Sequence, residues 1–256
     1  GTVASRVGVN IATAAFAAAT NVRQKALSLA AEILETKCEN LEIDDGIIRD
    51  KGKSNTTISL GELALKLAPM SGGAIPDGHT ASLESTSYDS SKGLAHASGS
   101  NVCELEVDTG TGEVKLLNYS VAHDCGKKIN PLIVEGQIIG GVVHGIGNAL
   151  FEEMIYDDNG QPQTTNYGEY LLPLATEMPP INIVHQETAS PLNPLGLKGA
   201  GEGGTIPAAG AIVAAIENAL QEFDVVIDRY PVTPQYLCDL IDSGAQTVTT
   251  PIPEEL

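Results

Sequence analysis

The sequence predicts an α+β fold, in which helices and β-hairpins are mixed. Some stretches carry apolar residues every three or four positions, as amphipathic helices do, whereas others alternate with the period of two that strands show. These stretches do not follow the strict alternation of a doubly wound parallel sheet. We expect one intertwined domain over residues 1–242, followed by an extended or disordered tail over residues 243–256.

The N-terminal part of the chain is predicted to hold two helices and a hairpin. Residues 11–35 carry apolar side chains at helical spacing, and their many alanines allow close packing. An Asp-Gly pair divides residues 41–48 into two short β-like runs, which is typical of a tight hairpin. Ser59 followed by Glu62 predicts a capping box at the start of a short helix.

The C-terminal part is predicted to hold a long hairpin, two helices and a further strand. Residues 101–123 alternate with period two around a glycine-rich turn, and residues 130–153 then become helical. A strand near 181–186 leads into a proline-rich loop. Residues 205–223 are predicted to form a helix with Thr205 as its N-cap and a proline in the first turn.

Charge and hydropathy exclude two classes of partner. The chain has 14 Lys and Arg against 33 Asp and Glu, a formal net charge of −19 at pH 7. A chain this acidic is repelled by nucleic acid and by anionic membranes. No apolar run approaches the ~18 residues of a membrane-spanning helix, and no signal peptide is recognisable. The chain begins at Gly1 without Met, so we expect a fragment or a split part of a larger subunit.

Cysteine and histidine spacing argues against metal ligation by side chains. The four cysteines lie far apart without a C-x-x-C pair, which excludes zinc and iron–sulfur ligation by this chain. Isolated thiols are typical of a reducing compartment and favour a cytoplasmic location. The five histidines show no metal-ligand spacing, and we interpret them as structural or surface residues.

Glycine is unusually frequent in the predicted helix within residues 130–153. Each interior glycine costs about 0.5–1 kcal/mol relative to alanine, so a compensating interaction is needed. Close approach of another helix would explain these glycines, and so would close approach of a bulky cofactor to the backbone; the sequence leaves both open. The glycines are Gly136, Gly140, Gly141, Gly145 and Gly147.

A carboxylate stands in a second glycine-rich stretch, over residues 196–207. Glu202 is surrounded by Gly199, Gly201, Gly203 and Gly204. The glycines formally match G-x-G-x-x-G, but Pro191 and Pro194 prevent the tight strand-to-turn junction of a dinucleotide fold. A helix N-terminus here would still suit an anion such as a phosphate. On spacing alone, Glu202 is best explained as a favourable contact with the helix dipole.

Three stretches, taken together, resemble the xanthine oxidase family of molybdenum hydroxylases. "DCGKKINPLIVEGQIIGGVVHGIGNALFEE" (124–153) resembles a signature of that family, and "KGAGEGGTIPAAGAIVAAIENAL" (198–220) resembles its G-x-G-E loop and following helix. "GTVASRVG" (1–8) is similar to a serine/arginine segment that touches the cofactor tail. The resemblance covers about residues 1–242, which are similar to the C-terminal part of the molybdopterin-binding large subunit of that family.

The resemblance implies a catalytic role for Glu202. In the family, the matching glutamate lies beside molybdenum and acts as the base when water-derived oxygen is transferred to a C–H carbon of an N-heterocycle or aldehyde. The pterin dithiolene holds the metal, so no protein ligand to molybdenum is expected. The implied cofactor-binding residues are Ser5, Arg6, Val7, Thr80, Ala81, Ser82, Cys125, Gln137, Gly140, Gly141, His144, Gly199, Ala200 and Gly201.

The resemblance also implies cofactors and partners. The form "GEGGT" is similar to bacterial large subunits, which use molybdopterin cytosine dinucleotide. The remaining part of the large subunit, an iron–sulfur subunit with [2Fe–2S] clusters and an FAD subunit are the expected partners, with a small-molecule substrate. Two alternatives remain: a cofactor-binding half without catalytic activity, and an unrelated nucleotide-binding module.

Overall fold

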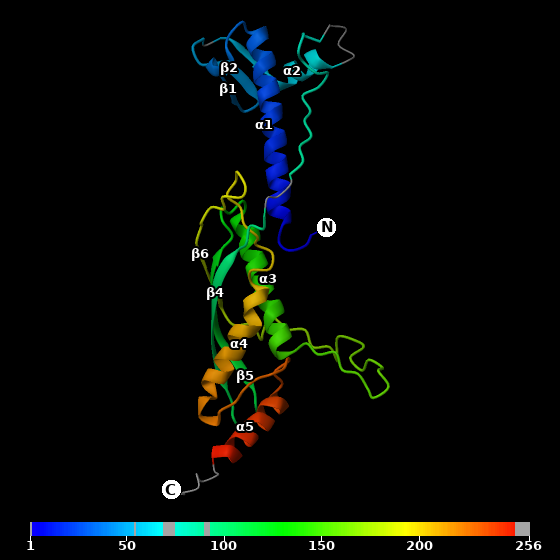
Figure 1. Ribbon diagram of the computed structural model, residues 1–256, viewed down its shortest axis with the longest axis vertical. Coiled ribbons are helices and arrows are strands. Elements are labelled where there is room, and N and C mark those ends of the chain that lie inside the picture. Colours follow the sequence, from blue (N-terminus) through cyan, green and yellow to red (C-terminus); the bar gives the residue numbers. More distant parts are fainter. Residues whose placement is uncertain (1, 54, 69–74, 90–92, 249–256) are drawn as a thin grey trace. The chain divides into compact units, whose positions relative to one another are not determined.

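The computed structural model contains helices and small sheets in a mixed order, which confirms the α+β class (Figure 1). The structure describes residues 2–53, 55–68, 75–89 and 93–248. The chain divides into two compact units. Unit 1 comprises Gly1–Val9 and Lys92–Leu256, and unit 2 comprises Asn10–Ser91. The sequence predicts one domain over residues 1–242, and no residue pattern in it marks this division into two units.

Unit 2 contains an antiparallel sheet in the order β1 (Leu41–Asp44), β2 (Ile47–Asp50) and β3 (Thr57–Ser59). The predicted hairpin is confirmed, because Asp45 and Gly46 both have positive φ angles, 45° and 74°. A two-residue turn with both central residues in this region matches the right-handed twist of the flanking strands.

Two helices complete unit 2. Helix α1 (Val7–Ile33) begins in unit 1 and continues into unit 2, where its C-terminal half contributes alanine and leucine side chains to the core. Helix α2 (Leu60–Leu67) begins at the predicted capping box: Ser59 accepts a hydrogen bond from the Glu62 backbone, and Glu62 accepts one from Ser59 N. The fully buried core comprises Ala26, Leu29, Ala30, Ile48 and Leu63.

Unit 1 contains a three-stranded sheet in the order β4 (Ser98–Val107), β5 (Val114–Asp124) and β6 (Ile181–His185). Strands β4 and β5 form the predicted long hairpin. Strand β6 pairs with β5 in parallel, with Tyr119 opposite Ile181. Parallel strands need a long crossover connection, and here the connection includes a whole helix.

That helix is α3 (Pro131–Leu150), and it packs against α4 (Thr205–Ala219). The N-cap of α4 is Gly204 and not Thr205, which is already the first helical residue. The correction has a packing reason: a Cβ on Gly204 would lie 2.2 Å from the Ile138 carbonyl oxygen, so only glycine fits where the chain enters α4.

Helix α5 (Pro234–Val248) completes unit 1 and continues past the expected boundary at residue 242. Its buried side chains Tyr236, Leu237 and Ile241 keep the helical spacing, so the first part of the expected tail is helical. Residues 249–256 lie outside the described residues. The core of unit 1 lies where α3, α4 and α5 meet the sheet, with Ile138, Val142, Ile146, Ile212, Ile216 and Leu237 all fully buried.

Four of the five glycines of α3 fall into two groups, and the fifth, Gly147, lies against the Glu152 side chain. An added Cβ on Gly141 would lie 2.8 Å from Thr205 N, and one on Gly145 would lie 2.3 Å from Ala208 Cβ, so both permit close packing of α4. An added Cβ on Gly136 or Gly140 would meet nothing within 4 Å. Helix packing therefore explains Gly141 and Gly145 but not Gly136 and Gly140.

A segment without regular secondary structure follows α3, and we call residues 151–178 the arm. Figure 1 shows the arm projecting away from the helices and sheet of unit 1 as two adjacent runs of chain. The chain then enters β6, so the arm lies entirely within the crossover between β5 and β6.

Candidate functional site

Glu202 is held by Ser5, a residue far away in the sequence. Glu202 lies in the turn that precedes α4, and its side chain is exposed in this chain. Ser5 Oγ donates a hydrogen bond to Glu202 Oε2 (3.2 Å) and accepts one from Glu202 N (3.1 Å). Glu202 Oε1 has no hydrogen bond to any described residue, so one carboxylate oxygen is oriented and the other is available to a ligand.

The Ser5 backbone adopts an uncommon conformation. Ala4 and Ser5 have φ angles of 51° and 54°, in the left-handed region that side chains other than glycine rarely adopt. Such strain costs about 1–3 kcal/mol per residue and is concentrated at functional sites. The turn brings the Ser5 hydroxyl to Glu202, and the two hydrogen bonds between these residues stabilise it.

Small residues allow the N-terminal segment to lie against the Glu202 turn. An added Cβ on Gly199 would lie 2.9 Å from Ser5 Cβ, and one on Gly201 would lie 3.4 Å from Ser5 Oγ and 3.7 Å from Gln137 Nε2. The structure therefore brings together Ser5, Gln137, Gly199, Gly201 and Glu202, all of which the resemblance implies as site residues.

The exposed face of α3 extends this site. Gln137, Gly140 and His144 lie three and four residues apart, so they share one face of the helix, and all three are exposed. Gly140 leaves open space there, whereas the neighbouring Gly141 is buried against α4. Of the four α3 residues that the resemblance implies, Gln137, Gly140 and His144 form an exposed face, and Gly141 packs against α4.

A buried ion pair supports the chain immediately before Glu202. Lys198 Nζ lies 2.9 Å from Asp124 Oδ2, and Asp124 is only 7% exposed. Asp124 also accepts hydrogen bonds from Gly126 N (2.8 Å), Thr188 N (3.2 Å) and the Thr188 hydroxyl. Every one of these contacts joins the end of β5 to the loops that follow β5 and β6.

These hydrogen bonds control the ionisation of Asp124. Burial alone raises the pKa of its carboxyl, but the hydrogen bonds from Thr188, Gly126 and Lys198 outweigh burial and hold the pKa well below its ordinary value. Asp124 is therefore ionised at neutral pH and paired with the Lys198 ammonium.

Backbone contacts continue from this ion pair to Glu202. Lys198 N donates to Cys125 O (2.8 Å), and Gly199 N donates to Ala95 O (3.0 Å). Gly126 and Gly196, both with φ of 68°, approach so closely that a Cβ on Gly126 would lie 2.2 Å from Gly196 O. The segment before Glu202 is thus fixed by its backbone over several consecutive residues.

A buried histidine lies beneath the turn. His123 is 2% exposed, and neither ring nitrogen has a hydrogen-bond partner among the described residues. A Cβ on Gly203 would lie 2.2 Å from His123 Nε2. Burial lowers the pKa of His123, His185 lowers it further, and Asp124 partly opposes both. A neutral imidazole therefore packs against the residue next to Glu202.

The remaining predicted residues are distributed over both units. Arg6 is exposed, and Val7 is the first residue of α1. Cys125 and Ala200 belong to the unit 1 core or pack against it. The predicted Thr80, Ala81 and Ser82 belong to unit 2, where Thr80 Oγ1 accepts a hydrogen bond from Lys25 Nζ (3.3 Å).

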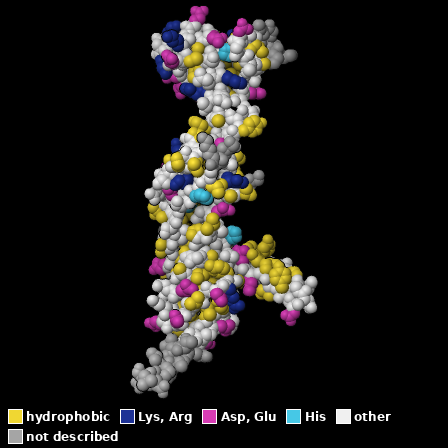
Figure 2. All heavy atoms as spheres, viewed as in Figure 1, with side chains coloured by type: hydrophobic (Ala, Val, Ile, Leu, Met, Phe, Trp, Pro, Cys, Tyr) yellow, Lys and Arg dark blue, Asp and Glu magenta, His cyan; other side chains and the backbone are white. Residues whose placement is uncertain are grey.

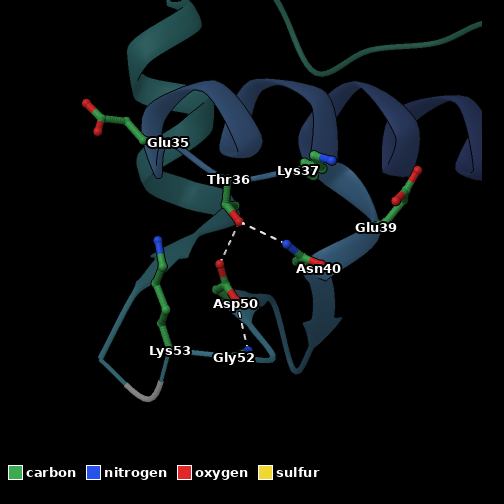
Figure 3. A pocket seen from close by; sticks show the side chains of 8 residues that line it. All are labelled: Glu35, Thr36, Lys37, Glu39, Asn40, Asp50, Gly52 and Lys53. Atoms are coloured by element: carbon green, nitrogen blue, oxygen red, sulfur yellow. Dashed lines mark hydrogen bonds between the residues drawn. The ribbon is translucent and has the colours of Figure 1, made fainter.

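Unit 2 contains a polar pocket that has a structural explanation (Figure 3). Figure 3 shows Asp50 between Thr36 and Gly52: Thr36 Oγ1 donates to Asp50 Oδ2 (2.7 Å), and Gly52 N donates to Asp50 Oδ1 (2.8 Å). Asn40 Nδ2 donates in turn to Thr36 Oγ1 (3.4 Å). These bonds join the end of α1 to the β2–β3 loop, and they satisfy the buried carboxylate.

Sequence reasoning missed the cluster of Asp124, Thr188 and Lys198. Asp124 and Lys198 are 74 positions apart, and no short-range pattern connects them. One feature of the sequence could have indicated the pair: Asp124 and Lys198 each stand immediately before a turn that contains glycine. Within the described residues, no three His, Cys, Asp or Glu side chains are placed to hold a metal ion, and no helix is long and apolar enough to cross a membrane.

Comparison with protein families and curated proteins gives a consistent result. The model of a molybdopterin cofactor-binding domain matches residues 1–179. The "6-hydroxypseudooxynicotine dehydrogenase complex subunit gamma" of Paenarthrobacter nicotinovorans is 40% identical over 238 residues, 93% of this chain and 30% of that protein. The "Carbon monoxide dehydrogenase large chain" of Afipia carboxidovorans is 32% identical over 202 residues, 79% of this chain and 24% of that protein.

Solved structures match over nearly the whole chain. Quinoline 2-oxidoreductase from Pseudomonas putida 86 has a TM-score of 0.82 and 38% identity, covering 93% of this chain and 30% of that one. A Cu,Mo-CO dehydrogenase has a TM-score of 0.85 and 27% identity, covering 96% of this chain and 30% of that one. The chain therefore spans less than a third of the length of these relatives.

Proposed function

Because this chain belongs to the molybdopterin cofactor-binding domain family, we propose that it forms the C-terminal part of the large subunit of a molybdenum hydroxylase. The complete enzyme oxidises a C–H bond of its substrate with oxygen derived from water, and Glu202 is the catalytic base. The observation that carries this proposal is the pair of hydrogen bonds between Ser5 and Glu202.

The geometry of Glu202 suits a base. Ser5 orients Oε2 and the backbone of the turn, while Oε1 has no partner among the described residues and accepts the proton. A general base must be positioned within hydrogen-bond reach of the proton that it removes, and such catalysis contributes about 10²- to 10⁴-fold in rate. The ion pair of Lys198 with Asp124 keeps the turn in place through the backbone.

The residues around Glu202 fit a large, flat cofactor. Gly140 leaves open space on an exposed helix face, with Gln137 and His144 beside it as hydrogen-bonding groups. Gly199 and Gly201 let the backbone before and after Ala200 approach Ser5 closely. When bound, the molybdenum cofactor supplies the two-electron oxidation of the substrate carbon. The pterin dithiolene would hold molybdenum, so no side chain of this chain is proposed as a ligand to it.

The remaining contacts follow from the resemblance. Ser5, Arg6 and Val7 bind the dinucleotide portion, which we propose to be the cytosine form. Thr80, Ala81, Ser82, Cys125 and Ala200 complete the proposed cofactor-binding set, whereas Gly141, which the resemblance also implies, packs against Thr205 of α4. The rest of the large subunit, an iron–sulfur subunit and an FAD subunit in the cytoplasm complete the enzyme and carry the electrons away.

The relatives favour an N-heterocycle as the substrate class. The "Nicotine 6-hydroxylase large subunit" of Paenarthrobacter nicotinovorans is 37% identical over 92% of this chain, and the quinoline 2-oxidoreductase is 38% identical. Both names specify a nitrogen heterocycle. We therefore propose a nitrogen heteroaromatic compound as the substrate, and an aldehyde as the alternative.

The test replaces Glu202 by glutamine in the assembled complex. Glu202→Gln keeps the size and the Ser5 contact but removes the base, so turnover should fall by about 10²- to 10⁴-fold. Molybdenum content, measured by elemental analysis, should stay near the wild-type value. Glu222→Gln, which changes an exposed carboxylate in the turn after α4, is the matched control and should leave turnover unchanged.

A cofactor-binding half without catalytic activity is the competing function. In that case the wild-type complex would contain molybdenum but would not oxidise quinoline, nicotine or aldehydes with an artificial electron acceptor. Full turnover by Glu202→Gln would instead reject Glu202 as the base, while leaving cofactor binding intact. The absence of molybdenum and of released CMP from native complex would reject the cofactor assignment.

A further inference from the structure

The arm, residues 151–178, keeps its shape through polar contacts. Ile155 N donates to Thr164 Oγ1 (2.7 Å), and Gln163 N donates to Ile155 O (2.7 Å), which pairs the two runs of chain. At its base, Tyr170 donates to Glu152 Oε2 (2.5 Å). The arm is therefore an ordered element, although it contains neither helix nor strand.

The arm lacks an apolar core of its own. Of its residues, all of which the structure describes, only Phe151 and Met178, at its two ends, pack against the core of unit 1. Large apolar side chains between these ends are exposed, with Tyr167 at 81%. Figure 2 shows hydrophobic side chains gathered along this segment. They are Met154, Ile155, Tyr156, Tyr167, Leu171, Leu172 and Leu174.

The charge of the arm has a single sign. The segment contains no Lys, Arg or His, so all 14 Lys and Arg of the chain lie elsewhere. Its acidic residues are Glu152, Glu153, Asp157, Asp158, Glu169 and Glu177. A second copy of the arm and an anionic membrane would both repel this surface, whereas a surface bordered by lysine and arginine would attract it.

We propose that the arm docks onto the remaining part of the same large subunit, at an apolar surface bordered by lysines and arginines. Contiguous exposed apolar patches rimmed by polar residues mark protein interfaces. In the relatives the matched region makes up 30% or 24% of the polypeptide, so most of their chain is available to cover the arm. This inference rests on one part of the proposed function, namely that the chain is part of a longer large subunit. It does not depend on the role of Glu202.

Zero-length cross-linking of the native complex tests the docking. A carbodiimide joins a carboxylate directly to a lysine amine, so only charge pairs in contact are captured. We expect linked peptides that join Glu153 or Asp158 to lysines of the large subunit outside residues 1–256. Links to lysines within residues 1–256 of a second copy, identified by mixed isotope labelling, would overturn the proposal. Links only to a separate iron–sulfur or FAD subunit would overturn it too, as would an arm that yields no links.

Reversing charges on the arm, and then on its partner lysine, tests whether electrostatic attraction contributes to docking. Glu153 and Asp158 are exposed, and their carboxylates make no hydrogen bonds within the described residues. Glu153→Lys with Asp158→Lys should lower the yield of assembled complex at least tenfold, and reversal of the cross-linked lysine to glutamate should restore it. Glu104→Lys with Glu106→Lys, exposed on β4, makes the same charge change and should have little effect.

Assembly unaffected by the arm variant would contradict the proposal. The cross-link map does not depend on the activity or molybdenum content of the complex. Failure of the Glu202→Gln prediction would therefore leave the docking result standing, and failure of docking would leave the catalytic assignment standing.

Discussion

At the scale of single residues, Gly203 is the position beside Glu202 where a side chain is least tolerated. A Cβ there would lie 2.2 Å from Nε2 of the buried His123 ring. Overpacking of this kind costs about 1–3 kcal/mol. We expect Gly203→Ala to lower the free energy of unfolding in urea by that amount and to displace Glu202.

The control is Gly210→Ala on α4, where an added Cβ meets nothing within 4 Å. Replacing an interior helical glycine by alanine should stabilise the protein by about 0.5–1 kcal/mol. Equal stability of the two variants would show that the imidazole moves aside and that the turn is not fixed by His123.

The ion pair of Asp124 with Lys198 gives a second prediction at this scale. Asp124→Asn leaves the largely buried Lys198 ammonium without its charged partner, which should cost about 3 kcal/mol of unfolding free energy at pH 7. Asp242→Asn, at an exposed carboxylate of α5, is the control and should change stability little.

The same pair predicts the direction of a pH dependence. The folded pKa of Asp124 lies below its ordinary value of 3.8, so the unfolded chain takes up a proton that the folded chain does not. The stabilisation is therefore complete at neutral pH and is lost progressively below about pH 5. The difference between wild type and Asp124→Asn, measured by thermal denaturation, should narrow as the pH is lowered; a constant difference would contradict the ionised buried carboxylate.

At the scale of secondary-structure elements, the glycines of α3 divide into positions that pack against α4 and positions on the face where we propose cofactor binding. Gly145→Ala would clash with Ala208 Cβ and should destabilise the protein by about 1–3 kcal/mol. Gly140→Ala meets open space, so it should keep or slightly raise stability while lowering the molybdenum content of the complex. Urea denaturation and elemental analysis measure the two effects; unchanged molybdenum in Gly140→Ala would contradict close approach of the cofactor to this face.

Elements with short-range signals were predictable from the sequence. The Asp45-Gly46 turn and the Ser59–Glu62 capping box act over two to four residues, and both are present as expected. The N-cap of α4 was predicted one residue late, because residue spacing does not show that Gly204 approaches α3 closely. The parallel pairing of β6 with β5 was not foreseen, since no local pattern states which distant strand is the neighbour.

The candidate site was only partly predictable for the same reason. From the residues alone, Glu202 was an ordinary carboxylate near a helix, and the role that we propose for it came from the family resemblance. Its partner Ser5 lies 197 positions away. The Asp124–Lys198 pair stayed unnoticed because each residue alone resembles a solvated surface charge. Contacts between distant segments depend on the tertiary fold, which residue spacing does not encode.

At the scale of the whole molecule, the two units have separate cores. Ile48 in unit 2 and Ile146 in unit 1 are both fully buried, and the two core clusters share no residue. Ile48→Ala and Ile146→Ala should each cost about 2–5 kcal/mol, mainly in the unit that carries the change. Hydrogen exchange measured by mass spectrometry, resolved by peptide, distinguishes the units; equal deprotection of both units by each variant would indicate one cooperative structure.

Parallel pairing of β5 and β6 brings the ends of both strands to the same edge of the sheet, where Thr188 meets Asp124. Because the arm lies wholly within the crossover between these strands, its length can change without altering the strand register. Lengthening a loop costs little entropy, so insertions and deletions are tolerated there. The length of the arm can therefore change while Glu202 and the supporting pair of Asp124 with Lys198 stay in position.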